Sequence, residues 1–234
     1  DMEQIPVISL NLAGIESNPG FHLNADLLLR AAVGAEFGDI FMRCVYRMRP
    51  YEATPGSVDA LHKKWLAKVQ KFVSAKHISI PKFRKMCVQI IRDFDAIPVL
   101  DIKKPRVGVV GEILVKFLPA ANNYVVDLLE AEGAEAVVPD LTDFLLYCCY
   151  NTNFKADYLG ASKKAKFMNN RLIAFFEWLR KDARDELAKS KHFEPTAHVQ
   201  DLAEYASPIV SCGNQTGEGW FLTGEMLAVS YTHL

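Results

Sequence analysis

The sequence has little of what identifies a membrane, secreted or nucleic-acid-binding protein. No apolar run reaches the ~18 residues that a membrane helix requires. The first ten residues carry two acids and lack the basic run of a signal peptide. Basic and acidic residues balance, 27 against 28, so the net charge of −1 gives no electrostatic footprint for nucleic acid. We therefore expect neither a membrane nor a nucleic-acid partner.

Cysteine is also sparse, and several catalytic motifs are absent. The five cysteines are an odd number and include no CxxC pair, which argues against a disulfide scaffold and favours a reducing, cytoplasmic setting. The sequence has no GxGxxG or Walker phosphate-binding pattern, no HExxH pair and no Ser–His–Asp arrangement. Any site must therefore be sought in less familiar patterns.

What the sequence does have is a change of pattern near Lys104. With 234 residues, 50% of them apolar, the chain can bury a sizeable core in one large or two small domains. Residues 1–104 read as a mostly helical segment with one strand at Ile5–Leu10, which ends in a polar turn at 11–20. From residue 105 to 228, strands alternate with helices, which predicts an α/β fold with parallel pairing and right-handed crossovers.

Caps and apolar spacing predict helices in the first segment. Asn24 is expected to cap a helix that Gly34 and Gly38 weaken, and Pro50 is expected to stop its continuation. Ser57 is expected to cap a second helix, and Ile80-Pro81 to begin a third. The faces predicted to be buried on these last two helices are Leu61, Trp65, Val69 and Phe72, then Phe83, Cys87, Ile90 and Phe94.

In the second segment we expect short strands at 107–110 and 134–139. Asn122-Asn123 are expected to cap a helix over 123–132 that Gly133 stops. A long helical pattern covers 160–191, with an apolar stripe and a charged face that we interpret as solvated. A further helix is expected over 199–205 and a further strand at Ile209-Val210. The predicted apolar stripe comprises Met168, Leu172, Phe175, Phe176, Leu179, Ala183 and Leu187.

The first candidate site lies beyond the strand at 107–110. Ligands of open α/β sheets collect at the carboxyl ends of the strands, and free N–H groups at a helix start suit phosphate or carboxylate. Gly111, Asn122 and Asn123 are therefore candidate binding residues, with Glu112 as a candidate acid/base. The alternative is that the asparagines only cap a helix and Glu112 is solvated, and spacing alone favours it.

The second candidate is the glycine-rich segment 212–220, which follows the possible strand at Ile209-Val210. Its glycines let backbone amides approach a ligand closely, unless it is an ordinary flexible loop. Cys212, on this polar segment, is the cysteine best placed to bind a metal, because Cys44 and Cys87 fall in apolar helical patterns. The adjacent Cys148 and Cys149 point to different helix faces. The candidate binding residues here are Asn214, Gln215, Thr216 and Glu218.

Seven phrases together carry a family resemblance. They are Ile5-Pro-Val-Ile-Ser-Leu-Asn11 with Asn18-Pro-Gly-Phe21, Tyr46-Arg-Met-Arg-Pro-Tyr51, Thr54-Pro-Gly-Ser57, Arg106-Val-Gly-Val-Val-Gly-Glu-Ile-Leu-Val115, Gly133-Ala-Glu-Ala-Val-Val-Pro139 and Gly213-Asn-Gln-Thr-Gly-Glu-Gly-Trp220. They resemble the 2-hydroxyacyl-CoA dehydratase-like region of the CoA-substrate-specific enzyme activases, also called 2-hydroxyglutaryl-CoA dehydratase activator-related proteins. The similarity covers nearly the whole chain except its tail.

The resemblance implies flavodoxin-like α/β units and oxygen-sensitive anaerobic metabolism in the cytoplasm. In related dehydratases an ATP-hydrolysing activase donates one electron, a [4Fe-4S] cluster passes it to an acyl-CoA substrate, and water leaves through a ketyl radical. The implied partners are thus the activase and an acyl-CoA. ATP would act only through the activase, because this chain has no ATPase motif.

Three functions follow as hypotheses. The first is that the chain is a fragment of such a dehydratase. Most ligands of the cluster would then lie outside the fragment, and the fragment alone would have little activity. The second is a non-catalytic docking module of the activase, and the third is a flavodoxin-like binder of a nucleotide or flavin. Residues 229–234 match the conceptual translation of a sequencing-adapter end. We interpret them as a non-native tail and expect the natural chain to continue past Met226.

Overall fold

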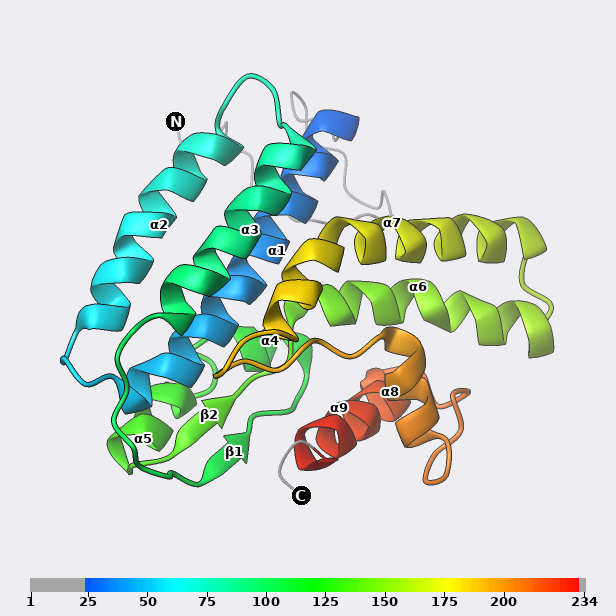
Figure 1. Cartoon of the computed structure of the whole chain (residues 1–234). Coiled ribbons are helices and arrows are strands. Elements are labelled where there is room, and N and C mark those ends of the chain that lie inside the picture. The colour runs from blue at the N-terminus through cyan, green and yellow to red at the C-terminus, as the bar shows by residue number, and fades with distance from the viewer. Residues whose placement is uncertain (1–23, 232–234) are drawn as a thin grey trace, which may run out of the picture.

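The computed structural model describes residues 24–231, so the strand expected at Ile5–Leu10 and the turn after it lie outside the described residues. The described part is mostly helical and has a small two-stranded parallel sheet (Figure 1). No helix in this part of the chain combines the length and apolarity needed to cross a membrane. In chain order the elements are α1 (Ala25–Met48), η2 (Arg49–Tyr51), α2 (Ser57–Val73), α3 (Ile80–Asp95), β1 (Arg106–Gly108), α4 (Ile113–Phe117), α5 (Val125–Ala131), β2 (Glu135–Val137), α6 (Leu141–Tyr158), α7 (Lys163–Leu187), α8 (Val199–Ala206), η3 (Thr216–Glu218) and α9 (Gly219–Tyr231).

The three N-terminal helices form largely where the sequence predicts them. The Asn24 side chain accepts the N–H of Leu27 at 2.8 Å and caps α1, which continues unbroken through Gly34 and Gly38. The buried faces of α2 and α3 are confirmed, except that Leu61 is only half-buried. The cap predicted at Ser57 is wrong. Gly56 holds that position with φ +82°, and the Glu52 carboxylate accepts the N–H groups of Gly56 and Val58.

The predicted parallel pairing is confirmed, with shorter strands than expected. Arg106 pairs with Glu135, and Gly108 with Val137. The pairing reaches one residue further, because the N–H of Val109 donates to the carbonyl of Val137 at 2.9 Å. The connection between the strands contains the unexpected short helix α4 as well as α5.

The further strand expected at Ile209-Val210 is wrong. The N–H groups of Ile209 and Val210 both donate to the carbonyl of Ala206, which makes a turn at the end of α8. A backbone held in such a turn has no extended edge to offer a sheet. Within residues 24–231 the sheet therefore has two strands.

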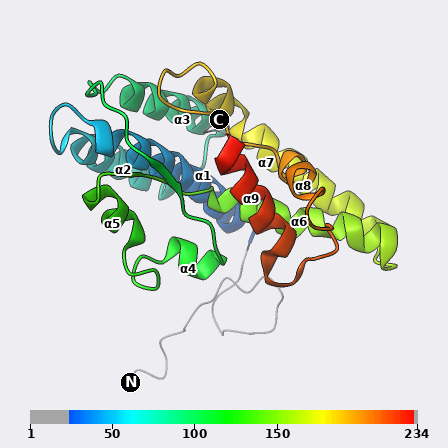
Figure 2. The ribbon, with the colours of Figure 1, turned by 90° about the horizontal axis from the view of Figure 1, so that it is seen from below.

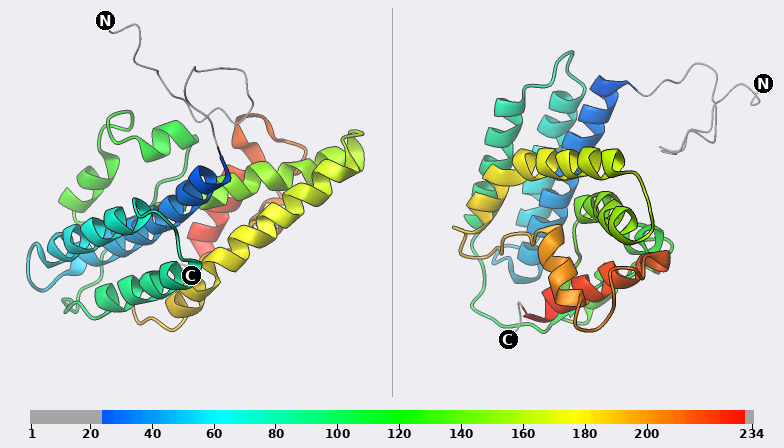
Figure 3. Two further views of the ribbon diagram at one scale, coloured as in Figure 1. Left: turned by 90° about the horizontal axis from the view of Figure 1, so that it is seen from above. Right: turned by 90° about the vertical axis from the view of Figure 1, so that its right-hand side faces the viewer.

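Helices α6 and α7 form a long antiparallel hairpin that runs away from the N-terminal helices (Figures 1 and 3). Only the C-terminal part of α7 packs on α3, so the apolar stripe predicted along α7 is wrong in its first half. Met168 and Leu172 are exposed, whereas Phe176, Leu179 and Leu187 are buried.

One apolar core takes side chains from both sides of Lys104. Buried residues of α1, α2 and α3 belong to the same cluster as those of α6, α7, α8 and the start of α9. Helix α1 also contacts β2. Seen from below, α9 lies beside α8 and crosses near α6 (Figure 2). α9 continues through Tyr231, and residues 232–234 lie outside the described part.

Candidate functional site

The carboxyl ends of the strands bring both predicted segments together. The connection after β1 leads into α4, and α9, which follows the glycine-rich segment, packs on β1. The Glu218 carboxylate faces the backbone N–H of Ile113 and interacts with the charges of Glu112 and Lys116. Burial, the largest effect, raises the pKa of Glu218. Two segments about a hundred residues apart in the sequence thus meet at this edge.

A buried ion pair joins α4 to α9, the helix that follows the glycine-rich segment. The Lys116 ammonium on α4 lies 2.8 Å from one carboxylate oxygen of Glu225 on α9 and 3.0 Å from the other. Both side chains are 1% exposed. Burial raises the pKa of Glu225 to about 7, and the charge of Lys116 opposes this shift. Neither residue was singled out from the sequence, because their pairing depends on tertiary structure.

Glu112, the candidate acid/base, has an exposed side chain at this edge. It is the N-cap of α4, and its carboxylate accepts the N–H of Val115 at 3.1 Å. Gly111 precedes it, with open space around its α-carbon. The Glu112 side chain therefore caps α4 and remains accessible to solvent.

The two asparagines differ in what they do. The Asn122 amide donates to the carbonyl of Val115 at 2.9 Å, and its oxygen accepts the N–H of Val125 at 3.2 Å. It therefore ties α4 to the first turn of α5, although Tyr124, and neither asparagine, holds the N-cap position. Asn123 has a left-handed backbone, with φ 55°, and the helix begins two residues later than the sequence predicts.

The glycine-rich segment is anchored to α6. The Gln215 amide donates to the carbonyls of Asn151 and Cys212, each at 3.2 Å. The Tyr147 hydroxyl donates to the carbonyl of Gln215 at 2.8 Å. The indole N–H of Trp220 donates to the Asn151 side chain at 2.8 Å inside the core. These bonds are inconsistent with an ordinary flexible loop.

The polar side chains of this segment also interact within it. The carbonyl of Asn214 accepts the N–H of Trp220, and its side chain lies against Gly219, where a Cβ would collide with it. Thr216 begins η3, which Glu218 ends. The amides predicted to bind a ligand thus serve first to shape the turn into α9.

The cysteines do not converge. Cys44 and Cys87 are buried, as predicted, while Cys148 is exposed and Cys149 and Cys212 are half-buried. Burial raises the pKa of the Cys212 thiol, which disfavours the thiolate that a metal requires. No group of three or more His, Cys, Asp or Glu side chains in residues 24–231 could hold a metal ion. The described residues therefore do not fit a [4Fe-4S] cluster, which needs three or four convergent thiolates.

A small cavity lies beside this edge, between α1, α4 and α5. It encloses about 170 Å³ and is lined by Lys116, Asn122, Tyr46 and Phe117. Of the predicted site residues, only Asn122 borders it. We refer to it as the crossover cavity.

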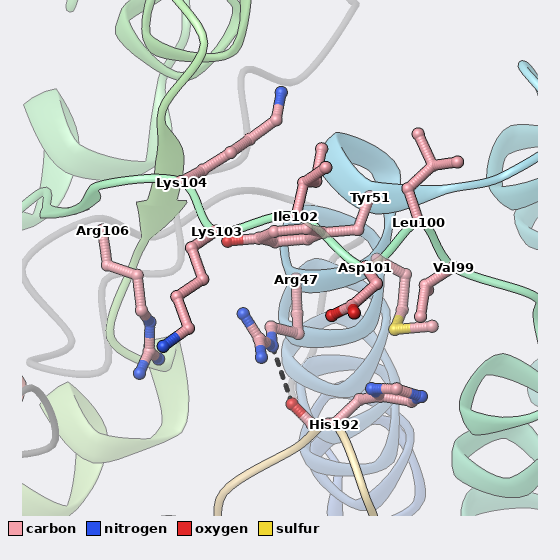
Figure 4. Close-up of a pocket in the computed structure, with 11 residues that line it drawn as sticks. Arg47, Tyr51, Val99, Leu100, Asp101, Ile102, Lys103, Lys104, Arg106 and His192 are labelled. Carbon is pink, nitrogen blue, oxygen red and sulfur yellow. Dashed lines mark hydrogen bonds between the residues drawn. The ribbon is translucent and has the colours of Figure 1, made fainter.

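A larger pocket lies at the opposite edge, where the strands begin. It encloses about 390 Å³, and we call it the basic pocket because Arg47, Lys103, Lys104 and Arg106 line it with Tyr51 and His192 (Figure 4). Arg47, Tyr51 and Arg106 occur in the phrases that resemble the family, and the sequence pattern predicts no binding role for them or for the two lysines. Their proximity depends on the packing of α1 against the sheet.

No family model, no curated protein and no solved structure matches the chain.

Proposed function

We propose that the chain forms part of an iron–sulfur-dependent, 2-hydroxyacyl-CoA dehydratase-type protein that works with an ATP-driven, electron-donating activase. The observation that carries the proposal is the meeting of segments 111–123 and 212–220 at the carboxyl ends of β1 and β2. Both segments contain phrases that resemble the family, and this edge is where open α/β sheets bind ligands.

The same proposal includes a flavodoxin-like fold for the α/β part of the chain. The unit β1–α4–α5–β2, with its parallel register and helical crossover, supports a flavodoxin-like arrangement. A flavodoxin-like sheet needs more than two strands, and these would come from outside the described residues.

Roles for individual residues follow from their positions. Glu112 is proposed to accept a proton from the acyl-CoA or to donate one to it, because its side chain is exposed beside the strand ends. Cys212 is proposed as one thiolate ligand of a [4Fe-4S] cluster whose other ligands lie outside residues 24–231. The described thiols do not form a cluster site by themselves, so the electron-transfer step would belong to the intact protein.

Iron and sulfide analysis of the intact protein, reconstituted without oxygen, tests the proposal. We expect bound iron and sulfide, with a lower content in Cys212→Ser. Cys149→Ser is the matched control, since Cys149 is also half-buried but lies on α6. Cys87→Ser should affect packing and leave iron content unchanged. Absence of iron and sulfide would refute the dehydratase assignment, and equal retention in all three variants would remove Cys212 as a ligand.

A second candidate, a non-catalytic docking module for the activase, is favoured by the tip of the α6–α7 hairpin. Tyr158, Leu159, Phe167 and Met168 are exposed there, at 74%, 68%, 66% and 60%. Clustered exposed apolar side chains of this size mark interaction surfaces. The tip projects away from the N-terminal helices, which makes it accessible to a partner (Figure 1).

Binding to the activase distinguishes this candidate from the first. Phe167→Ser with Met168→Ser should weaken binding at least tenfold and leave iron content unchanged. Leu28→Ser is the control, because Leu28 is exposed on α1, far along the chain from the hairpin. Equal binding by the hairpin variant and the control would exclude the tip as a docking surface.

A flavodoxin-like nucleotide or flavin site at the carboxyl edge is the third candidate. It predicts a yellow protein or stabilisation by the ligand. The crossover cavity, at about 170 Å³, falls below the ~300–1,000 Å³ of most small-molecule sites. This candidate therefore has less support than the other two.

A further inference from the structure

We propose that the basic pocket is a ligand site of its own, for an organic phosphate about the size of a mononucleotide. The pocket lies at the amino ends of β1 and β2, because Arg106 and Glu135 are the first residues of these strands. The candidate site described above lies at their carboxyl ends. The inference therefore does not depend on the dehydratase proposal.

Several elements build the pocket. Arg47 and Met48 come from the last turn of α1, Tyr51 from η2, and His192 from the connection between α7 and α8. The remaining wall is the segment 99–104, which leads into β1. At about 390 Å³ the pocket falls within the ~300–1,000 Å³ of small-molecule sites.

A buried carboxylate holds the two arginines in position. Glu135, whose side chain is 1% exposed, forms ion pairs with Arg47 and with Arg106, the latter at 2.9 Å. The Tyr51 hydroxyl also donates to Glu135, at 2.8 Å. The Arg47 Nε donates to the carbonyl of His192 at 2.7 Å, as the dashed line in Figure 4 marks. Guanidinium groups fixed in advance lose little freedom when they bind an anion.

Lys103 supplies the charge that is not already neutralised. Figure 4 shows its ammonium extending to the same side of the segment as the guanidinium groups of Arg47 and Arg106, whereas Lys104 extends the opposite way. No carboxylate within residues 24–231 forms an ion pair with Lys103. An ammonium beside ordered guanidinium groups offers the several convergent donors that a phosphate accepts.

The charge balance around the pocket limits the affinity for an anion, which the convergent donors would bind. Four cations line the pocket, against Asp101 in the wall and the carboxylates of Glu135 and Glu194, which bind the arginines. One positive charge remains in excess when Lys104 is counted, and none when the count is limited to Arg47, Lys103 and Arg106, whose charged groups extend to the same side. Binding should therefore be moderate and should weaken with salt, since exposed charges are screened.

The apolar part of the wall indicates that the anion is organic. Leu100 and Ile102 are 49% and 45% exposed, and Val99 and Met48 line the pocket behind them. The Tyr51 ring lies 5.1 Å from the Arg47 guanidinium carbon. Inorganic phosphate would leave these surfaces in water, whereas a purine or similar ring would cover them.

Isothermal titration calorimetry of the whole chain with AMP, adenosine and inorganic phosphate tests the site. AMP should bind in 50 mM salt, with adenosine and phosphate each at least tenfold weaker, and its affinity should fall in 300 mM salt. No binding of AMP at millimolar concentration would overturn the inference. Equal affinity for AMP and inorganic phosphate would overturn the inference that the ligand carries an organic group.

Two neighbouring lysines provide the matched variants. Lys103→Ala should weaken AMP binding about tenfold, and Lys104→Ala less than twofold, because only Lys103 extends toward the arginines. Neither side chain is buried, so both variants should keep the thermal unfolding midpoint of the parent chain. An equal loss of AMP affinity in both variants would show that only the overall positive charge matters, and it would refute the site.

Discussion

The Lys116 ammonium lies 2.8 Å from a carboxylate oxygen of Glu225, with both side chains excluded from water. The ammonium also lies 5.0 Å from the ring centre of Phe117 and 5.7 Å from that of Phe221. Removing one member of such a pair leaves the other buried without its counter-charge. The pair therefore connects the stability of the sheet's crossover to the position of α9.

Lys116→Met should lower the free energy of unfolding by about 3–5 kcal/mol at pH 8, because Glu225 would stay buried without its counter-charge. The loss should be smaller at pH 5, where Glu225 binds a proton. The double variant Lys116→Met with Glu225→Leu should recover most of the stability, since neither charge remains. Urea unfolding at both pH values measures these differences.

Lys166→Met is the control for that series, since it breaks an ion pair with Asp157 in which both partners are partly exposed. Exposed pairs contribute about 0–1 kcal/mol. A similar loss in Lys116→Met and Lys166→Met would show that burial does not determine the value of the Lys116–Glu225 pair.

Glu36 should make stability depend on pH. Its side chain is buried on α1 near Arg180, Asp39, Asp140 and Asp143, and its Oε1 has no hydrogen-bond partner within the described residues. Burial raises the pKa of Glu36 well above the usual 4.5. The folded chain therefore keeps a proton that the unfolded chain releases, and stability should fall as pH rises above 4.5.

Glu36→Gln removes this titration and should gain stability relative to the parent chain as pH rises, by up to ~1.4 kcal/mol per pH unit. Denaturant unfolding at pH 5, 7 and 8.5 measures the difference. Glu204→Gln, on an exposed site of α8, should show no such trend. A difference between Glu36→Gln and parent that does not change with pH would contradict the protonated state of Glu36.

Gly224→Ala and Gly38→Ala should change stability in opposite directions. A Cβ at Gly224 would collide with the backbone carbonyl of Leu202, where α9 crosses α8, so we expect a loss of about 1–3 kcal/mol. A Cβ at Gly38 meets nothing within 4 Å on the exposed side of α1. That variant should gain about 0.5–1 kcal/mol. Thermal unfolding of both variants checks the pair, and a shift of the same sign would contradict the close approach at Gly224.

Asn151→Leu should cost about 1–3 kcal/mol, because it leaves the buried indole N–H of Trp220 without an acceptor. Trp220→Phe should cost less in the Asn151→Leu background than in the parent chain, since the hydrogen bond is already lost. Urea unfolding of the four proteins in this cycle gives the coupling. Purely additive losses would show that this bond does not anchor the glycine-rich segment.

Local signals predict the fold best where an element depends on its own residues. Asn24 caps α1, Pro50 follows its end, and Gly133 ends α5 with φ +84°. The parallel pairing follows from the alternation after Lys104. The prediction is wrong where a neighbouring side chain or the tertiary packing decides. Glu52, rather than Ser57, caps α2, and half of the α7 stripe is exposed on the projecting hairpin.

The candidate site, like the fold, has features that the sequence predicts and features that only the structure reveals. Glycine, asparagine and glutamate at strand ends were visible in the sequence, and two of the predicted segments do meet. The charges that organise both edges were not visible, because Lys116 and Glu225 are 109 positions apart and Arg47 and Glu135 are 88 apart. Pairs with such separations have no local pattern and require the fold itself.

The apolar core shared by helices before and after Lys104 also determines how the chain would respond to a cut. Because buried side chains of α1 and α3 pack with those of α6 and α7, a protease nick between Asp95 and Arg106 would leave two pieces held together by that core. Each piece alone would expose an apolar face. The two halves are therefore suited to reassembly by fragment complementation, and neither is suited to separate expression.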